Sequence, residues 1–317
     1  MAVATHSAPK KRIYQFDWKE YDQTLINRGD ISIYLEILDH MESELEILNT
    51  KKIGRKFLYP DCLFVFCAII RYIFHISFRQ LEGFLKFLSP HYGFSVPQYS
   101  TIHKRIQTID LEQYFPAFDF SDSNISIAID SSGLKLYQYS DWLRSKHGAQ
   151  SKPRKGWIKI HFGVEIKNHC VVAVKITDEQ VGDSTEAIPL LSEAQKKCAK
   201  LDRTFGDGAY DTKEVFNYCA KHKIDPIIRV RKNSSPKARG SPARAAVVRA
   251  IQNYGFANWK KMKEYGKRWS VERAYSVFKG HFGDAVCSRT FEHICVEVRQ
   301  KVALMNIWLH QLSEIKV

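Results

Sequence analysis

Two stretches with a strict period of two constrain the fold of this chain more than any other feature. In Ile125–Asp130 and in Lys159–Ile166 every second residue is a large apolar one, the pattern of a strand with one buried face. A short turn and a further apolar run at 170–176 predict a hairpin. Together these stretches predict an α/β (α+β) fold, a mixed sheet flanked by helices, over residues 119–317.

The residues after this hairpin alternate between helical and strand patterns. Asp183 and Glu186 are spaced as a capping box and predict the start of a helix. The expected elements are a helix at 183–200, a strand at 203–206, a helix at 212–222, a strand at 226–230, a loop rich in Ser, Pro, Arg and Gly, and helices at 269–282 and 294–312.

The first part of the chain has no strand pattern. Residues 1–50 are polar and mixed, with one helical stretch near 31–48, and residues 51–118 predict a helical domain. Its expected helices lie at 61–74, 77–88 and 100–109.

The third of these helices has Lys104 and Arg105 beside an apolar stripe, as in a helix-turn-helix that contacts DNA. The connection before it, 89–99, is long for the usual turn, so a plain three-helix packing module is an equal alternative. The most apolar stretch, Leu63–Phe74, is too short to span a bilayer and contains Arg71. We therefore expect a buried helix here and no membrane partner.

The charge of the chain points to a partner. A formal net charge of +14 favours a polyanion, and nucleic acid is the commonest one. The segment Arg229–Gly280 has fourteen Lys or Arg and two acidic residues, a net +12. Its interleaved aromatic residues favour a nucleic-acid track over a plain basic surface; they are Tyr254, Trp259, Tyr265, Trp269 and Tyr275.

Cysteine spacing and the N-terminus both favour a cytoplasmic location. None of the seven cysteines forms a CxxC pair, so neither a disulfide framework nor a zinc site is expected. The segment Met1–Arg12 ends in Lys-Lys-Arg without an apolar core, which is unlike a secretory signal.

Two aspartates follow expected strands. Asp130 ends the first strand, before Ser131-Ser132-Gly133, which predicts a turn; an ordinary turn aspartate is the alternative. Asp207 lies between two glycines after the strand at 203–206, where a metal or phosphate can approach closely. Asp211 is assigned to a capping box with Glu214, so we expect the functional role at Asp207.

A third carboxylate belongs to a helix with an unusual polar stripe. Tyr265, Arg268, Glu272 and Lys279 fall within an arc of roughly 60° on a helical wheel. An ordinary amphipathic helix with an Arg–Glu pair is the alternative. The opposite side of the helix is apolar and should face the core; it has Val271, Ala274, Val277 and Phe278.

The spacing Tyr-x2-Arg-x3-Glu-x6-Lys resembles the signature of DDE insertion-sequence transposases of the group usually numbered four and five (five-type). The resemblance covers nearly all of residues 51–317. Asp130 in Ile-Asp-Ser-Ser-Gly, Asp207 in Gly-Asp-Gly-Ala-Tyr-Asp and Glu272 are similar to the three acidic motifs of that group, in the same order. Gly280 departs from it, since a basic residue is common there.

The resemblance implies an RNase H-like catalytic core in a prokaryotic, chromosome-associated enzyme. It implies that Asp130, Asp207 and Glu272 hold two Mg²⁺ ions, which Mn²⁺ can replace. Water would cleave DNA at the terminal inverted repeats, and the freed 3′-OH would attack target DNA. Tyr265, Arg268 and Lys279 are expected to hold DNA phosphates, with Lys104 and Arg105 adding contacts. A homodimer or larger assembly on DNA is expected.

Three alternatives stay open on the sequence. Another RNase H-like nuclease would share the carboxylates but lack strand transfer. A sequence-specific DNA-binding regulator would use the basic segment without catalysis, and a transposase relic would be inactive in its host. The role of His161 stays open as well: it lies beside Lys159 on the polar face of its strand and could contact DNA or a carboxylate, although a structural histidine is the more common case.

Overall fold

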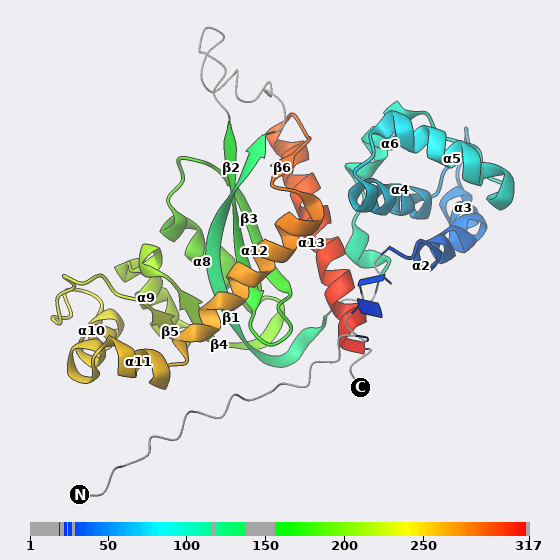
Figure 1. The fold of residues 1–317 in the computed structure, drawn as a ribbon. Coiled ribbons are helices and arrows are strands. Elements are labelled where there is room, and N and C mark those ends of the chain that lie inside the picture. The colour runs from blue at the N-terminus through cyan, green and yellow to red at the C-terminus, as the bar shows by residue number, and fades with distance from the viewer. Residues whose placement is uncertain are drawn as a thin grey trace, which may run out of the picture.

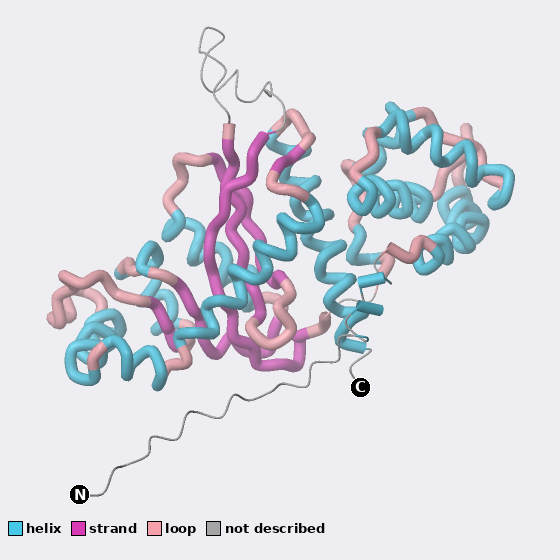
Figure 2. The backbone as a smooth tube through the Cα atoms, viewed as in Figure 1, coloured by secondary structure: helices cyan, strands magenta, loops and turns pink. Residues whose placement is uncertain are grey.

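The computed structural model describes residues 19, 22–23, 25–26, 29–115, 118–136 and 156–314. The expected Lys-Lys-Arg segment at the N-terminus lies outside these residues. At the centre is a mixed sheet with helices on both faces (Figure 2). Its strands are β1 (Phe120–Leu136), β2 (Trp157–Glu165), β3 (Val171–Asp178), β4 (Cys198–Gly206), β5 (Asp225–Ile228) and β6 (Ala285–Val286).

The strand order is β3-β2-β1-β4-β5, and β6 pairs with the far end of β1. The β1–β2 and β2–β3 pairs are antiparallel, whereas β4 and β5 continue the sheet in parallel. Three antiparallel strands continued by two parallel ones form the expected RNase H-like mixed sheet.

Strand β1 is longer than predicted and corrects one expectation. The turn expected at Ser131-Ser132-Gly133 is wrong, because these residues continue the ladder and pair with His161, Ile160 and Lys159. The partner strand β2 offers each of them a ladder position, and tertiary pairing overrides the local turn preference of Ser and Gly.

Two helices lie on opposite faces of the sheet. Helix α12 (Trp269–Phe282) crosses one face diagonally (Figure 1), and its Phe278 packs in one core with Ala128 and Phe162. Helix α8 (Asp183–Gln195) covers the other face, where it packs with Ile127 and Ile129. Alternate residues of β1 therefore belong to different cores, as its period predicts.

The boundaries of α8 differ from those expected. Asp183 and Glu186 do not form the predicted capping box, because the N-cap residue is Gly182 and has no side chain to accept a bond. Asp183 instead accepts a hydrogen bond from Lys159 at 3.1 Å. The helix ends at Gln195, and residues 198–200, which were expected to be helical, belong to β4.

A group of short helices extends beyond β5 at the parallel edge of the sheet (Figure 1). They are α9 (Lys213–Lys221), α10 (Pro242–Tyr254) and α11 (Phe256–Met262). Helices α10 and α11 replace much of the loop predicted after 230, where the alanine-rich run at 243–246 was an unused helix signal. Two 3-10 helices complete this part of the chain: η3 (Gly208–Tyr210), which contacts α8, and η4 (Tyr265–Arg268), which contacts β4 and β1.

The N-terminal helices form a compact group around α4 (Asp61–Phe74), which is almost entirely buried. Helix α5 (Phe78–Tyr92) begins with a capping box of Ser77 and Gln80, and α6 (Tyr99–Ile106) packs on both. The remaining elements are α2 (Ser32–Leu35), η1 (Glu36–His40), α3 (Met41–Asn49) and η2 (Leu111–Gln113).

These helices share a continuous core with the C-terminal helix α13 (Phe291–Glu314). The Gln300 amide on α13 donates to the carbonyls of Ile106 and Ile109 at 2.7 and 2.9 Å. It also accepts from the Tyr72 hydroxyl at 2.7 Å. Helix α13 thus contacts both the helical group and the sheet.

In the described part of the chain, no single helix is long and apolar enough to cross a membrane. Helices α4 and α5 pass that test only as a pair, and they are bent by 119° at their junction.

Candidate active site

Sheet register places the two expected aspartates side by side. Ala128 of β1 pairs in parallel with Phe205 of β4. Two residues further along each strand come Asp130 and Asp207, which therefore lie at neighbouring positions of adjacent strands, about 5 Å apart at the backbone. Asp207 follows the last residue of β4, at the carboxyl edge where sites form in α/β sheets.

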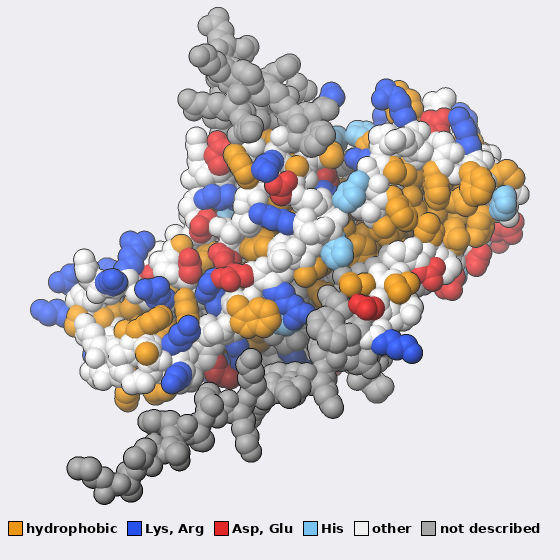
Figure 3. All heavy atoms as spheres, viewed as in Figure 1, with side chains coloured by type: hydrophobic (Ala, Val, Ile, Leu, Met, Phe, Trp, Pro, Cys, Tyr) orange, Lys and Arg blue, Asp and Glu red, His pale blue; other side chains and the backbone are white. Residues whose placement is uncertain are grey.

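Helix α12 brings the third carboxylate to the same place. The Arg268 guanidinium lies at the start of this helix and donates to Asp130 Oδ2 at 3.4 Å. It also forms an ion pair with Glu272, one turn along the helix. On this face of the molecule, acidic side chains gather where α12 crosses the sheet, with Lys and Arg around them (Figure 3).

The environment of Asp130 is unusual for a carboxylate. Its side chain is 24% exposed, and burial raises its pKa to about 6. The backbone N–H of Ser131 and the charge of Arg268 oppose this rise, whereas the charges of Asp207 and Glu272 add to it. The three carboxylates are thus close enough to interact electrostatically.

The described residues contain no group of three His, Cys, Asp or Glu side chains already arranged around a metal position. The donor chemistry nevertheless fits a hard cation, because three carboxylates converge and one of them is half-buried with a raised pKa. Asp207 is partly used, since its Oδ1 accepts from the Ala209 N–H at 2.8 Å and caps η3.

Tyr275 is a site residue that the sequence did not single out as one. Its buried ring stacks on Phe162, and its hydroxyl accepts from the Phe162 N–H at 3.1 Å. The same hydroxyl lies 2.8 Å from the carbonyl of Asp130. It thus bridges β1 and β2 at the expected catalytic residue. A buried Tyr one turn after Glu272 was the available signal, because a buried Tyr hydroxyl usually has a partner.

Asp211 has a structural role, but a different one from that predicted. Thr212, not Asp211, is the N-cap of α9 and accepts from the Val215 N–H. The Asp211 side chain is fully buried and accepts two hydrogen bonds from Arg244 of α10, at 2.6 and 2.8 Å. This pair fastens the start of α10 to the loop that bears Asp207.

The expected DNA-binding residues lie in different surroundings. Lys279 is half-buried and donates to Ser132 Oγ at 2.8 Å. Tyr265 precedes α12 and is only 9% exposed, packed on Trp259. On α6, Lys104 is exposed, whereas Arg105 forms an ion pair with Asp61.

The aromatic residues of the basic segment correct another expectation. Trp259, Tyr265 and Tyr275 belong to the core, so the prediction that all five aromatic residues offer stacking surface is wrong for these three. Trp259 of α11 packs on Tyr265 of η4, and Tyr275 packs on Phe162 of the sheet. Tyr254 and Trp269, 54% and 51% exposed, remain on the surface.

His161 is a buried structural residue, as expected. Its Nε2 lies 2.8 Å from Thr177 Oγ1, on the neighbouring strand β3. Its Nδ1 has no hydrogen-bond partner among the described residues. Burial lowers the pKa of His161 to about 4, so the ring is neutral.

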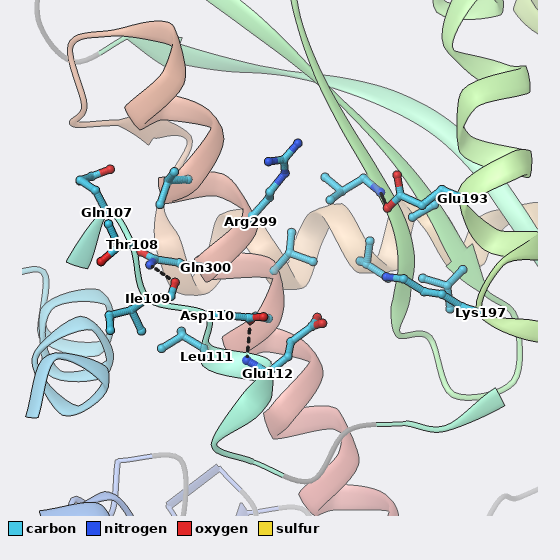
Figure 4. Close-up of a pocket in the computed structure, with 17 residues that line it drawn as sticks. Gln107, Thr108, Ile109, Asp110, Leu111, Glu112, Glu193, Lys197, Arg299 and Gln300 are labelled. Atoms are coloured by element: carbon cyan, nitrogen blue, oxygen red, sulfur yellow. Dashed lines mark hydrogen bonds between the residues drawn. The ribbon is translucent and has the colours of Figure 1, made fainter. Parts of the chain in front are cut away.

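A cavity of about 340 Å³ lies elsewhere, along the edge strand β3. Figure 4 shows it between α13, the segment 107–112 and the end of α8. None of the three carboxylates lines it, so this cavity is separate from the candidate site.

Comparison with known families agrees with this arrangement. Two family models, each described as a transposase DDE domain, match residues 124–307 and 26–139. The first covers more than half of the chain and includes all three carboxylates. The chain belongs to the transposase DDE domain family. The carboxylates of this transposase therefore lie within the matched domain.

Several individual proteins are similar to this transposase. An uncharacterised protein of Aquifex aeolicus (strain VF5) is 25% identical, over 83% of this chain and 84% of that protein. A chain of the simian T-cell lymphotropic virus intasome in complex with PP2A regulatory subunit B56 gamma is 12% identical over 65% of both chains, with a TM-score of 0.26. This transposase thus spans 65% of that chain.

Two structures of Mos1 are also similar. The strand transfer complex is 10% identical over 81% of this chain and 80% of that one, with a TM-score of 0.24. The mariner paired end complex with Mn is 9% identical over 91% and 92%, with a TM-score of 0.25.

Proposed function

We propose that this transposase cleaves DNA at the ends of an insertion sequence and joins the freed 3′-OH to target DNA. The proposal is carried by one observation: Asp130, Asp207 and Glu272 meet from two adjacent strands and a helix that crosses them. The order and spacing of these residues, with Tyr265 and Lys279, support the insertion-sequence group numbered four and five.

The carboxylates would be the catalytic, metal-binding residues. When bound, two Mg²⁺ ions, or Mn²⁺ in their place, supply activation of the attacking oxygen and stabilisation of the leaving one. Asp130, Asp207 and Glu272 offer the oxygen ligands that such ions prefer. Water is the nucleophile in the first reaction and the 3′-OH in the second, so one set of residues serves both.

The surrounding cations would hold DNA. Arg268 suits a bidentate contact to a phosphate, and Lys279 provides a point charge on the same helix. Tyr265 lies in the same short 3-10 helix, η4, as Arg268, which supports a place for its hydroxyl near the same phosphate.

The rest of the chain would extend the contact with DNA. We propose that residues 51–118 act as a DNA-binding domain through Lys104 and Arg105, and that residues 119–317 form the catalytic domain. Two transposon ends must be held together, so the active form would be a homodimer or larger.

The test is a cleavage and joining assay with purified protein and labelled DNA that carries the sequences flanking the gene. Wild type should nick these ends with Mg²⁺ or Mn²⁺, lose activity in EDTA, and join ends to a target plasmid. Asp207→Asn and Glu272→Gln should abolish both reactions and keep DNA binding. Asp202→Asn, on the same strand but paired with Lys200 on the surface, is the matched control.

Two other outcomes of this assay would favour a different function. Binding without cleavage under all metal conditions would favour a DNA-binding regulator or an inactive relic. Nicking without joining would favour a nuclease.

A further inference from the structure

The start of α12 contains a cation held between two of the proposed metal ligands. Arg268 is the N-cap residue of this helix, and its side chain is 24% exposed. One guanidinium nitrogen donates to Asp130 Oδ2 at 3.4 Å, and another is paired with Glu272. Within the described residues, no other cationic side chain hydrogen-bonds to either carboxylate.

An ordinary helix pair does not explain this geometry. An Arg and a Glu four residues apart stabilise a helix only weakly, and such a pair needs no third group. Here the second contact reaches a residue 138 positions away in the sequence, on the central strand. A half-buried carboxylate is costly to leave without a partner charge, and Asp130 takes its partner from α12.

We infer that Arg268 is an internal counter-cation that occupies the carboxylate site in the DNA-free protein and leaves it when a DNA phosphate binds the guanidinium. This inference rests on the proposed function. A guanidinium and a metal ion cannot both lie between Asp130 and Glu272, because their charges repel and they need the same oxygens. A phosphate offers Arg268 a bidentate acceptor, so DNA binding exposes the carboxylates.

The consequence is that metal ions and DNA bind cooperatively. Linkage requires that each raises the affinity of the other by the same factor. A protein built in this way binds metal poorly until a substrate phosphate is in place, which limits cleavage away from a correctly bound end.

The test measures Mn²⁺ binding by the full chain without DNA, from the electron paramagnetic resonance signal of the free ion. Arg268→Gln should bind Mn²⁺ roughly tenfold more tightly than wild type. Arg268→Lys keeps the charge but loses the planar fork, so it should also bind more tightly than wild type. Lys267→Gln removes a neighbouring charge that is paired with Glu264 and should change the affinity less than twofold.

A second arm adds duplex DNA that carries the sequences flanking the gene. It should tighten Mn²⁺ binding by wild type and have little effect on Arg268→Gln. Equal affinities for wild type, Arg268→Gln and Arg268→Lys would overturn the counter-cation and leave the proposed function standing, provided that Asp130→Asn abolishes binding. If Mn²⁺ binds no variant in a manner that depends on Asp130, even with DNA, the proposed function fails as well.

Discussion

The buried carboxylate of Asp211 depends on the single guanidinium of Arg244. The pair differs from the surface ion pairs around it, because the Asp211 side chain has no exposed area. The same carboxylate also accepts hydrogen bonds from the Arg231 N–H and the Ser234 hydroxyl, which belong to the basic segment. One buried charge thus fixes the start of α10 relative to the loop that follows β4.

Arg244→Met should therefore lower the free energy of unfolding by about 3–5 kcal/mol, because it leaves a buried charge without its partner. Urea denaturation followed by circular dichroism measures the change. Lys263→Met is the matched control, since its pair with Asp225 is 41% and 43% exposed and should contribute less than about 1 kcal/mol. Equal losses in the two variants would contradict a special role for Asp211.

At the scale of elements, β2 and β3 are joined by a histidine that resists protonation. His161 is fully buried in β2 and contacts Thr177 of β3. Its pKa in the folded protein, about 4, is below its ordinary value of 6.5 because of burial. Above pH 6.5 the ring is neutral in both states, so it then adds no pH dependence to stability.

As the pH falls through 6.5, the unfolded chain binds a proton that the folded chain does not bind until about pH 4. Titration of His161 should lower the free energy of unfolding across this window, by on the order of 3 kcal/mol in all. The raised pKa of Asp130 acts in the opposite direction, equally in wild type and in the variant. Urea titrations at several pH values should therefore show a free energy of unfolding that falls by that much more in wild type than in His161→Gln. His222→Gln, an exposed histidine of similar size, should behave as wild type. A parallel decline in His161→Gln would exclude this cause.

The observed helices and strands show which sequence signals were sufficient to predict the bounds of an element. Helices α4 and α12 have the predicted bounds, since their apolar periodicity and their actual packing coincide. The end of β1 was wrong because the partner strand, and not the local Ser-Ser-Gly, decides whether a strand continues. Helices α10 and α11 were missed because their basic composition was interpreted as a surface loop, whereas Ala245 and Val248 of α10 and Trp259 of α11 are buried.

The candidate site was predictable only in part, because its geometry depends on contacts between residues far apart in the sequence. The positions of Asp130 and Asp207 followed from strand ends, but their adjacency depends on the β1–β4 register, which links residues 75 or more positions apart. The contact of Arg268 with Asp130 and the position of Tyr275 also depend on how α12 crosses the sheet. No local sequence pattern determines the angle at which α12 crosses the sheet.

At the scale of the whole molecule, the helical group and the sheet share one core through α13. We therefore expect one cooperative unfolding transition by calorimetry, with equal van't Hoff and calorimetric enthalpies. Gln300→Leu leaves the Ile106 and Ile109 carbonyls without their donor and should lower that single transition. Two separate transitions, with only one moved by Gln300→Leu, would show that the two parts fold independently.

If residues 51–118 contact DNA as proposed, the shared core also limits how this transposase can acquire new recognition sequences. Here α13 presents Gln300 to α6, and Trp308 donates to the Tyr34 hydroxyl at 2.7 Å. A helical region taken from a relative would have to match these contacts or leave α13 unpaired. Point substitutions on the exposed side of α6 are then the accessible route, and related elements should diverge there gradually rather than by recombination.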